Sequence, residues 1–421
     1  MTSPTTTAAL ADTRMSPTHW RALILLVLSV GINYIDRGSL SIAAPILQKE
    51  MGLSPEQLGL LFSSFFWTYA SFQILAGWLV DRYNVNLVFG IGFFVWSCAT
   101  AATGMVGGFM GLLSLRVVLG AGESVAYPAY SKILATGFPI RHRGLTNGLI
   151  DAGSKCGPAI GTLLGGLLVA NYGWRFLFLA LGLGSLPWLI GWIIWAPKPV
   201  VIFDRKTNPG PTAREIISHR STWGTFLVLF AINYAWYFLL TWLPTYLVQQ
   251  RHFSMEKMSL LGSVAFWGLA GSTTVAGIAS DRWIARNQNP TKVRKTFVAS
   301  GLLLCTLLVP ACYVEDANVS MGLIIAACLC FGLTTSNHWA VTQTLAGPLA
   351  SGKWTGLQNG FGNLAGVVAP YLTGVIVQRT GNYDYAFLVV GLFLLMGVGS
   401  ILFVVGPIRQ IEWKKSTALP G

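Results

Sequence analysis

Apolar residues occur along this chain in long runs that are separated by short polar segments. About twelve of these runs have the length of about 20 residues that a helix needs to cross about 30 Å of hydrocarbon. They lie near residues 22–47, 57–80, 86–105, 109–136, 145–170, 175–196, 223–248, 258–280, 295–314, 319–345, 355–378 and 385–406. The pattern predicts an all-α polytopic membrane protein with twelve transmembrane helices.

Composition supports this prediction. Soluble domains carry about 25% charged residues, whereas this chain has 10% charged and 53% hydrophobic residues. The polar first 20 residues lack the compact apolar region and small-residue cleavage site of a signal peptide, so we expect the first apolar run to be retained as a helix. The six cysteines lie nearly all in apolar runs and show neither metal-site spacing nor a disulfide framework.

The formal net charge of +13 is better explained by membrane topology than by nucleic-acid binding. If the amino terminus is cytoplasmic and the loops alternate, most loop Lys and Arg residues fall on the cytoplasmic side. Those that fall outside are Lys49, Arg175, Arg251, Lys257 and Arg379. We therefore expect both termini in the cytoplasm, a multi-pass position in the cell inner membrane, and no nucleic-acid partner.

A long polar segment, Ala196–Trp223, interrupts the apolar runs near the middle of the chain. It is rich in proline and basic residues and divides the chain into two halves of six helices. The expected domains are a cytoplasmic tail 1–20, a bundle 21–196, a cytoplasmic loop 197–222, a second bundle 223–406 and a cytoplasmic tail 407–421.

The two halves repeat each other at an offset of 200 residues. "INYIDR" begins at Ile32 and "INYAWY" at Ile232, while "GWLVDRY" begins at Gly77 and "GIASDRW" at Gly277. Two matches in one register indicate parallel, pseudo-symmetric halves, a known transporter architecture. The second motif closes an even-numbered span on the cytoplasmic side in each half, which predicts a gating-loop role for Gly77, Asp81, Arg82, Gly277, Asp281 and Arg282.

The chain resembles the major facilitator superfamily over essentially its whole length. "GWLVDRYNVN" is similar to the superfamily signature between helices 2 and 3, although Asn84, Val85 and Asn86 replace its usual basic continuation. "NYIDR", "FFWTYASFQILAGWLVDR", "LRVVLGAGESVAYPAY" and "YFLLTWLPTYL" resemble the anion:cation symporters, which include galactonate, hexuronate, glucarate and phthalate-type permeases. The resemblance implies a twelve-helix fold in two bundles, a functional monomer, and no cofactor.

Six ionisable residues fall deep in the predicted spans: Asp36, Arg37, Arg116, Glu123, Asp151 and Lys155. Intramembrane charge is costly and marks ion paths and proton relays. Simple structural pairing is the alternative, although buried ion pairs contribute little to stability.

Arg37 is the residue we expect to bind a substrate carboxylate, because a guanidinium stays charged and matches carboxylate geometry with a planar fork. The resemblance implies the same role for this helix-1 arginine. It also implies that Asp36 and Glu123 carry the coupled proton, with Arg116 as their charge partner. Sequence neighbours on a helix differ by about 100°, so Asp36 and Arg37 need not pair with each other.

Helix 5 adds a less usual feature. Asp151 and Lys155 lie four residues apart, so they can pair on one helix face, or Lys155 can be a second contact for the anion. Gly153, Gly157, Gly161 and Gly165 repeat every four residues, which permits close helix approach. We expect this stripe to pack against a helix of the second half.

The remaining candidate substrate contacts are neutral. Hydroxyl and amide groups can hydrogen-bond a polyol, and Trp339 can close over a sugar-like chain; by resemblance, Tyr69, Trp339 and Asn363 match family substrate contacts. His338 is a candidate coupling group, although a lone histidine is more often structural. The set comprises Tyr34, Tyr69, Gln73, Tyr237, Ser336, Trp339, Asn359 and Asn363.

Together these features predict a proton-coupled importer of a small organic carboxylate, most simply a sugar acid, working by alternating access. An aromatic-acid symporter is the alternative. An organophosphate exchanger is disfavoured because residues 223–248 contain no Arg or Lys, and a multidrug exporter would not need Arg37. No zinc-protease, hydrolase or phosphate-loop motif is present, so we expect no enzymatic activity and no metal. A membrane sensor is the least favoured class.

Overall fold

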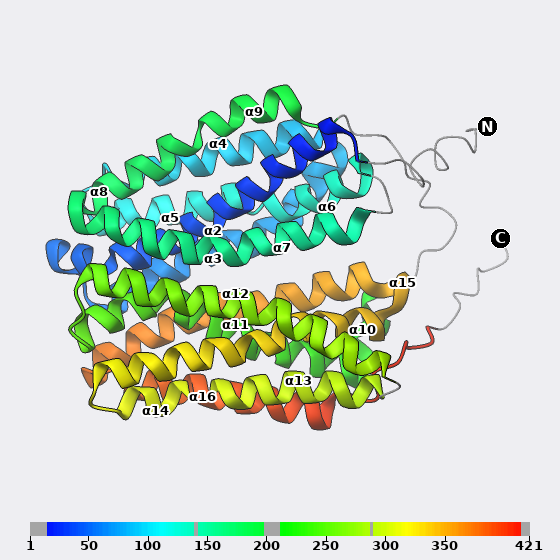
Figure 1. Cartoon of the computed structure of the whole chain (residues 1–421). Coiled ribbons are helices and arrows are strands. Elements are labelled where there is room, and N and C mark those ends of the chain that lie inside the picture. The colour runs from blue at the N-terminus through cyan, green and yellow to red at the C-terminus, as the bar shows by residue number, and fades with distance from the viewer. Residues whose placement is uncertain (1–14, 139–141, 198–210, 287–288, 414–421) are drawn as a thin grey trace. The chain divides into compact units, whose positions relative to one another are not determined.

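A computed structural model describes residues 15–138, 142–197, 211–286 and 289–413 of the chain (Figure 1). The side chain of Asp81, which belongs to the predicted gating motif, lies outside this description, as do parts of both predicted tails and of the central loop. In the described part, every regular element is helical. The predicted all-α fold class is therefore confirmed.

Among the described residues, the first half of the chain forms eight helices and one π-helical turn. They are α2 (Pro17–Met51), α3 (Pro55–Arg82), α4 (Val85–Thr103), α5 (Phe109–Glu123), α6 (Ala126–Gly137), α7 (Arg143–Ile160), η2 (Gly161–Gly165), α8 (Gly166–Ser185) and α9 (Pro187–Trp195).

In the part of the second half that the structure describes, there are seven helices and two π-helical turns. They are α10 (Ala213–Ser218), α11 (Arg220–Thr245), η3 (Tyr246–Gln250), α12 (Met255–Ala285), α13 (Pro290–Cys305), α14 (Leu308–Tyr313), α15 (Ala317–Thr380), α16 (Asp384–Gly399) and η4 (Ser400–Val404).

Local sequence sets the ends of the first two helices. Ser16 and Ser54 each form a capping box with the residue three positions later, and a proline occupies the first helical turn after each. These contacts satisfy backbone N–H groups that have no partner within the helix. The residue after α2, Gly52, caps the end of this helix. It has φ 64°, a left-handed conformation that glycine adopts readily.

The described residues contain ten helical stretches that are long and apolar enough to cross a membrane. One stretch, Leu145–Trp195, is interrupted at Gly173, a residue within α8 whose φ of 82° breaks the helix. The ribbon turns back near the α8 label in Figure 1. This stretch therefore accounts for two passes. The 28 residues of α3 supply a further helix of spanning length. The elements are consistent with the twelve predicted passes.

Two compact units make up the chain. Residues 1–203 and 240–263 form the first unit, and residues 204–239 and 264–421 form the second. The end of α11 and the start of α12 thus cluster with the first half of the chain. The bundle boundaries inferred from the sequence remain a prediction.

Glycines allow α5 to pack deeply inside the first unit. A Cβ atom on Gly120 would lie 2.2 Å from the carbonyl oxygen of Phe65 on α3, and one on Gly122 would lie 3.0 Å from the backbone nitrogen of Trp96 on α4. No other residue type fits at such distances without movement of the neighbouring backbone. This close approach places Glu123, the last residue of α5, in the interior of the unit.

The glycine stripe on α7 and η2, Gly153, Gly157, Gly161 and Gly165, packs differently from our expectation. A Cβ atom on Gly153 would lie 2.6 Å from Val30, and one on Gly157 would lie 2.7 Å from Cβ of Tyr34; both partners belong to α2. The expectation that these glycines contact a helix of the second half is therefore wrong. Their spacing indicates a face that another helix approaches closely, but it does not identify that helix.

Candidate functional site: a buried charge cluster in the first unit

The centre of the candidate site is an ion pair between α2 and α5. Nε of Arg37 donates to Oε2 of Glu123 at 2.8 Å, and the two side chains are only 4% and 0% exposed. Charges this deeply buried keep most of their mutual attraction because little water screens them. The pair thus joins the predicted anion-binding residue directly to a predicted proton carrier.

Aromatic rings surround the Arg37 guanidinium. Its central carbon lies 4.2 Å from the ring centroid of Tyr69, 4.8 Å from that of Tyr34 and 5.2 Å from that of Phe65. A cation over a ring face is attracted by the ring quadrupole. The rings therefore hold the guanidinium in place beside Glu123. Tyr34 also shares a 3.2 Å hydrogen bond with Tyr127.

Asp36 and Arg116 complete the cluster. Asp36 is fully buried, and neither of its carboxylate oxygens forms a hydrogen bond to a described residue. Its charged neighbours are Glu123 and Arg116 on α5, so it faces that helix. Nε of Arg116 donates to the carbonyl oxygen of Leu61 at 3.3 Å. The four charged groups comprise two acids and two bases.

Other predicted residues of the first unit are less deeply buried than this cluster. Gln73, Gly77 and Lys155 are half-buried, whereas Asp151 and Arg82 are exposed. The Arg82 guanidinium lies 5.9 Å from the ring centroid of Trp78 on its own helix. The structure therefore gathers Tyr34, Asp36, Arg37, Tyr69, Arg116 and Glu123 into one site.

Predicted contacts in the second unit form two separate sets. Tyr237 on α11 donates to Oδ1 of Asn363 on α15 at 2.9 Å, and both side chains are buried. The hydroxyl of Ser336 donates to the carbonyl oxygen of Thr273 at 3.3 Å. Trp339 and Asn359 are half-buried in the same unit.

His338 is buried next to Trp339 and contacts the side chain of Gln358, with 2.5 Å between their nitrogen atoms. Gln358 also bonds to the Thr225 carbonyl oxygen of α11 and to the hydroxyl of Thr342. The helix α15 is interrupted at Gly347, whose φ is 64°. This polar network connects α11 with the parts of α15 before and after that break. Such embedding favours the structural interpretation of His338.

Two basic residues were missed by the sequence reasoning. Nζ of Lys132 on α6 donates to the carbonyl oxygen of Val80 on α3 at 2.6 Å. Arg294 on α13 bonds to Asp281, Ser280 and Asn337. Lys132 carried a detectable signal, a charge within an apolar run, but Arg294 was indistinguishable from the other basic residues at a helix end.

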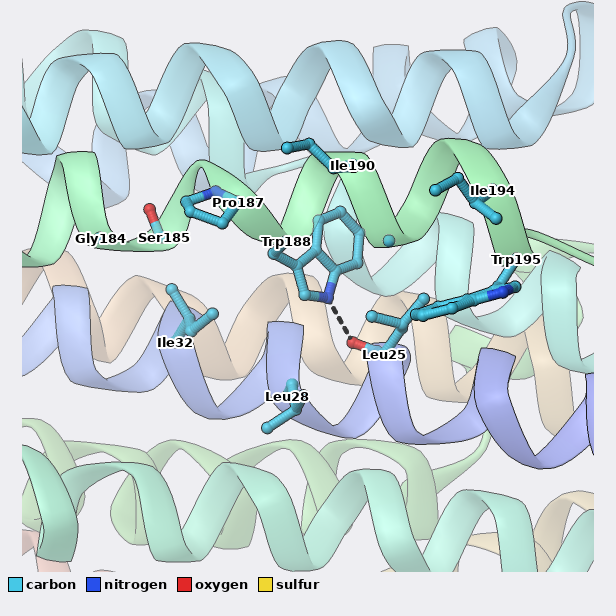
Figure 2. Close-up of a pocket in the computed structure, with 11 residues that line it drawn as sticks. Leu25, Leu28, Ile32, Gly184, Ser185, Pro187, Trp188, Ile190, Ile194 and Trp195 are labelled. Atoms are coloured by element: carbon cyan, nitrogen blue, oxygen red, sulfur yellow. Dashed lines mark hydrogen bonds between the residues drawn. The ribbon is translucent and has the colours of Figure 1, made fainter.

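An apolar groove of about 490 Å³ lies between α2, α8 and α9 of the first unit (Figure 2). Within it, the indole N–H of Trp188 on α9 donates a hydrogen bond of 2.8 Å to the carbonyl oxygen of Leu25 on α2. Leu28, Ile190 and Ile194 on its wall are exposed, and no charged residue lines it. A carboxylate would find no partner there, so the groove is not the anion site.

The chain is similar to known transporters in sequence and in structure. It is 31% identical to a probable galactarate/D-glucarate transporter of Escherichia coli (strain K12), over 98% of this chain and 99% of that protein. It is 30% identical to a hexuronate transporter of Bacillus subtilis (strain 168), over 92% and 94% of the two chains.

The fold also matches the crystal structure of a bacterial homologue of the human lysosomal transporter Spinster, inward-facing and occupied. The TM-score is 0.79 at 18% identity, and the match covers 93% of this chain and 97% of that one. The Major Facilitator Superfamily profile matches residues 26–350. The resemblance seen in the sequence motifs is thus confirmed, and the chain belongs to the Major Facilitator Superfamily of membrane transporters.

Proposed function

We propose that this transporter imports a small organic carboxylate, most simply a sugar acid, together with protons by alternating access across the cell inner membrane. The observation that carries the proposal is the buried Arg37–Glu123 pair with Asp36 beside it. An anion that approaches Arg37 competes with Glu123 for the same guanidinium. A proton on Glu123 removes that competition, so the proton and the anion favour each other's binding.

The charge balance of the cluster supports coupling of this kind. Asp36, Glu123, Arg37 and Arg116 are formally neutral together. One proton gives the cluster a unit positive charge, and a bound monoanion restores neutrality. The loaded and empty carriers then differ little in charge, which limits the cost of about 2.3 kcal/mol per charge per 100 mV of membrane potential.

The substrate class is inferred from the relatives and from the polar groups of the second unit. The printed names of both relatives refer to sugar acids, and Tyr237, Asn359 and Asn363 offer hydroxyl and amide groups suited to a polyol. The rings of Tyr34, Phe65 and Tyr69 near Arg37 favour an aromatic acid as the second candidate.

The test is transport by the purified protein in proteoliposomes with an inward proton gradient. Labelled aldonates, hexuronates, aldarates and aromatic acids form the panel. We expect accumulation of at least one sugar acid, abolished by a protonophore. Uptake of aromatic acids alone would favour the second candidate, and no transport of any labelled acid would contradict the proposal.

Substitutions then test the residue roles. We expect Asp36→Asn and Glu123→Gln to lose gradient-driven accumulation. Glu315→Gln, which alters an exposed acid between α14 and α15, is the matched control and should transport normally. If Asp36→Asn and Glu123→Gln both kept proton-driven accumulation, the assignment of the proton carriers would be wrong.

A further inference from the structure

Five buried side chains beside the ion pair carry polar atoms without hydrogen-bond partners among the described residues. Asn33 and Asp36 lie on α2, Trp96 and Thr100 on α4, and Glu123 on α5, and each is at most 1% exposed. The atoms are Nδ2 and Oδ1 of Asn33, both carboxylate oxygens of Asp36, Nε1 of Trp96, Oγ1 of Thr100 and Oε1 of Glu123. Most buried polar atoms in proteins have a partner, so a group of seven requires an explanation.

Helix packing brings these atoms to one place. Trp96 and Thr100 are one turn apart and share a face of α4. The backbone of α4 approaches α5 closely at this level, because a Cβ atom on Gly122, the residue before Glu123, would lie 3.0 Å from the backbone nitrogen of Trp96. The Thr100 hydroxyl lies next to Asp36 and the Asn33 amide lies next to Glu123, but none of the seven atoms has a partner among the described residues that meets the full distance and angle of a hydrogen bond.

The unpartnered atoms include both hydrogen-bond donors and acceptors, a mixture that suits water better than an ion. The Trp96 indole and the Asn33 amide present N–H groups, which a metal ion cannot satisfy. The carboxylates of Asp36 and Glu123 present acceptors, which an anion cannot satisfy. Water donates and accepts, and a buried water typically makes about three hydrogen bonds to such groups. A water that bridges two neighbouring polar groups can complete hydrogen bonds that their direct geometry leaves poor.

We propose that bound water occupies this position between α2, α4 and α5 and joins the carboxyls of Asp36 and Glu123 into one proton-sharing site. Trp96 and Thr100 are then positioning residues, because they hold the water rather than the substrate. A protonated carboxyl gives its proton to the water while the water gives one of its own to the other carboxylate. One proton moves, and the water is unchanged.

Other charged and titratable groups face the two carboxyls and set the conditions for this transfer. Arg116 faces Asp36; Arg37 and Arg116 face Glu123. The hydroxyls of Tyr69 and Tyr130 also lie near Glu123. The inference rests on the proposed proton coupling, but it adds a role for α4, a helix that contributes no charged residue to the cluster.

The test compares two threonines of α4. Thr100→Val removes the hydroxyl that faces Asp36 and keeps the side-chain shape. Thr103→Val is the matched control, because the Thr103 hydroxyl is buried but already donates to the Ala99 carbonyl oxygen at 2.8 Å. Thr100→Ser restores the hydroxyl. Each variant is measured in proteoliposomes for substrate counterflow, which needs no net proton movement, and for the pH profile of gradient-driven uptake.

We expect Thr100→Val to keep counterflow and to shift the midpoint of the pH profile upward by about half a unit or more, as loss of a hydrogen bond to an ionised carboxyl would. Thr103→Val and Thr100→Ser should retain the wild-type profile. Equal profiles for Thr100→Val and Thr103→Val would overturn the inference.

Trp96→Phe provides a second variant if Thr100→Val does not fold. It removes the indole N–H and keeps a ring against Phe93, whose centroid lies 4.5 Å from that of Trp96. We expect the same upward shift, and an unshifted profile with intact counterflow would overturn the inference. If a protonophore did not reduce uptake by the wild-type protein, the proposed function itself would be contradicted. Failure of this inference and failure of the proposed function are therefore distinguishable.

Discussion

Arg37 pairs with Glu123 on another helix and not with Asp36, the residue beside it in the chain. The 100° step of the helix separates the two neighbours, so each serves a different surface of α2. Arg37 faces the aromatic rings and Glu123, while Asp36 faces Glu123 and Arg116 of α5. In the proposed function, Glu123 is the residue through which a proton and an anion influence each other.

We predict that Arg37→Lys reduces substrate uptake at least about tenfold, because an ammonium group cannot replace a planar fork that binds a carboxylate through two hydrogen bonds. Initial rates of labelled substrate uptake in proteoliposomes measure the effect. Arg379→Lys, at an exposed position near the end of α15, is the control and should transport normally. Unchanged uptake by Arg37→Lys would remove Arg37 from the binding site.

A double substitution separates the two members of the ion pair. Arg37→Met leaves Glu123 buried without its cation, and breaking a buried pair in this way costs about 3–5 kcal/mol. Arg37→Met with Glu123→Gln removes both charges and should lose less stability than Arg37→Met alone. Thermal unfolding of the purified variants in detergent measures the difference. A double variant that is less stable than both single variants would show that the pair is not the dominant contact.

Much of the fold was predictable because each helix must supply its own apolar length. A run of about 20 apolar residues can be read from the chain alone, and the charges of Asp36, Arg37, Arg116 and Glu123 are conspicuous in such runs. Helical spacing also predicted that Asp36 and Arg37 face different ways. These inferences depend only on local sequence and on the cost of charge in hydrocarbon.

Partner choice was less predictable because it depends on the tertiary packing of distant segments. The glycine stripe on α7 and η2 indicates a close contact, yet its partner is α2, which contributes Val30 and Tyr34. In the sequence, Arg294 looks like any other basic residue at a helix end. Its bond to Asn337 joins residues 43 positions apart, and no local pattern indicates it.

Gly120→Ala should destabilise the first unit. The added Cβ would lie 2.2 Å from the Phe65 carbonyl oxygen and 2.5 Å from the Thr68 hydroxyl oxygen, so α3 and α5 would have to separate. Overpacking of this kind costs about 1–3 kcal/mol, occasionally more. A lower unfolding temperature and weaker uptake are the expected results.

Gly184→Ala is the control for this substitution. Gly184 lies in α8 with nothing within 4 Å of an added Cβ, so alanine should be neutral or slightly stabilising. If the two alanine variants unfolded at the same temperature, close α3–α5 packing would not be needed for stability.

Arg294 contacts one exposed and two buried partners in the second unit. Nη2 of Arg294 donates to Oδ1 of Asp281 at 2.6 Å, but Asp281 is 69% exposed, and exposed ion pairs typically contribute about 0.2–1 kcal/mol. Nη1 donates at 2.8 Å both to the Ser280 hydroxyl and to Oδ1 of the fully buried Asn337.

Because the guanidinium fork reaches all three partners at once, Arg294→Lys should lower the unfolding temperature more than Asp281→Asn. The small effect of Asp281→Asn should shrink further at high salt, which screens exposed charges, whereas the effect of Arg294→Lys should persist. Unfolding temperatures of both variants at low and high salt test this ranking. An equal, salt-sensitive loss in the two variants would mean that the exposed ion pair, and not the buried amide of Asn337, is the main partner of Arg294.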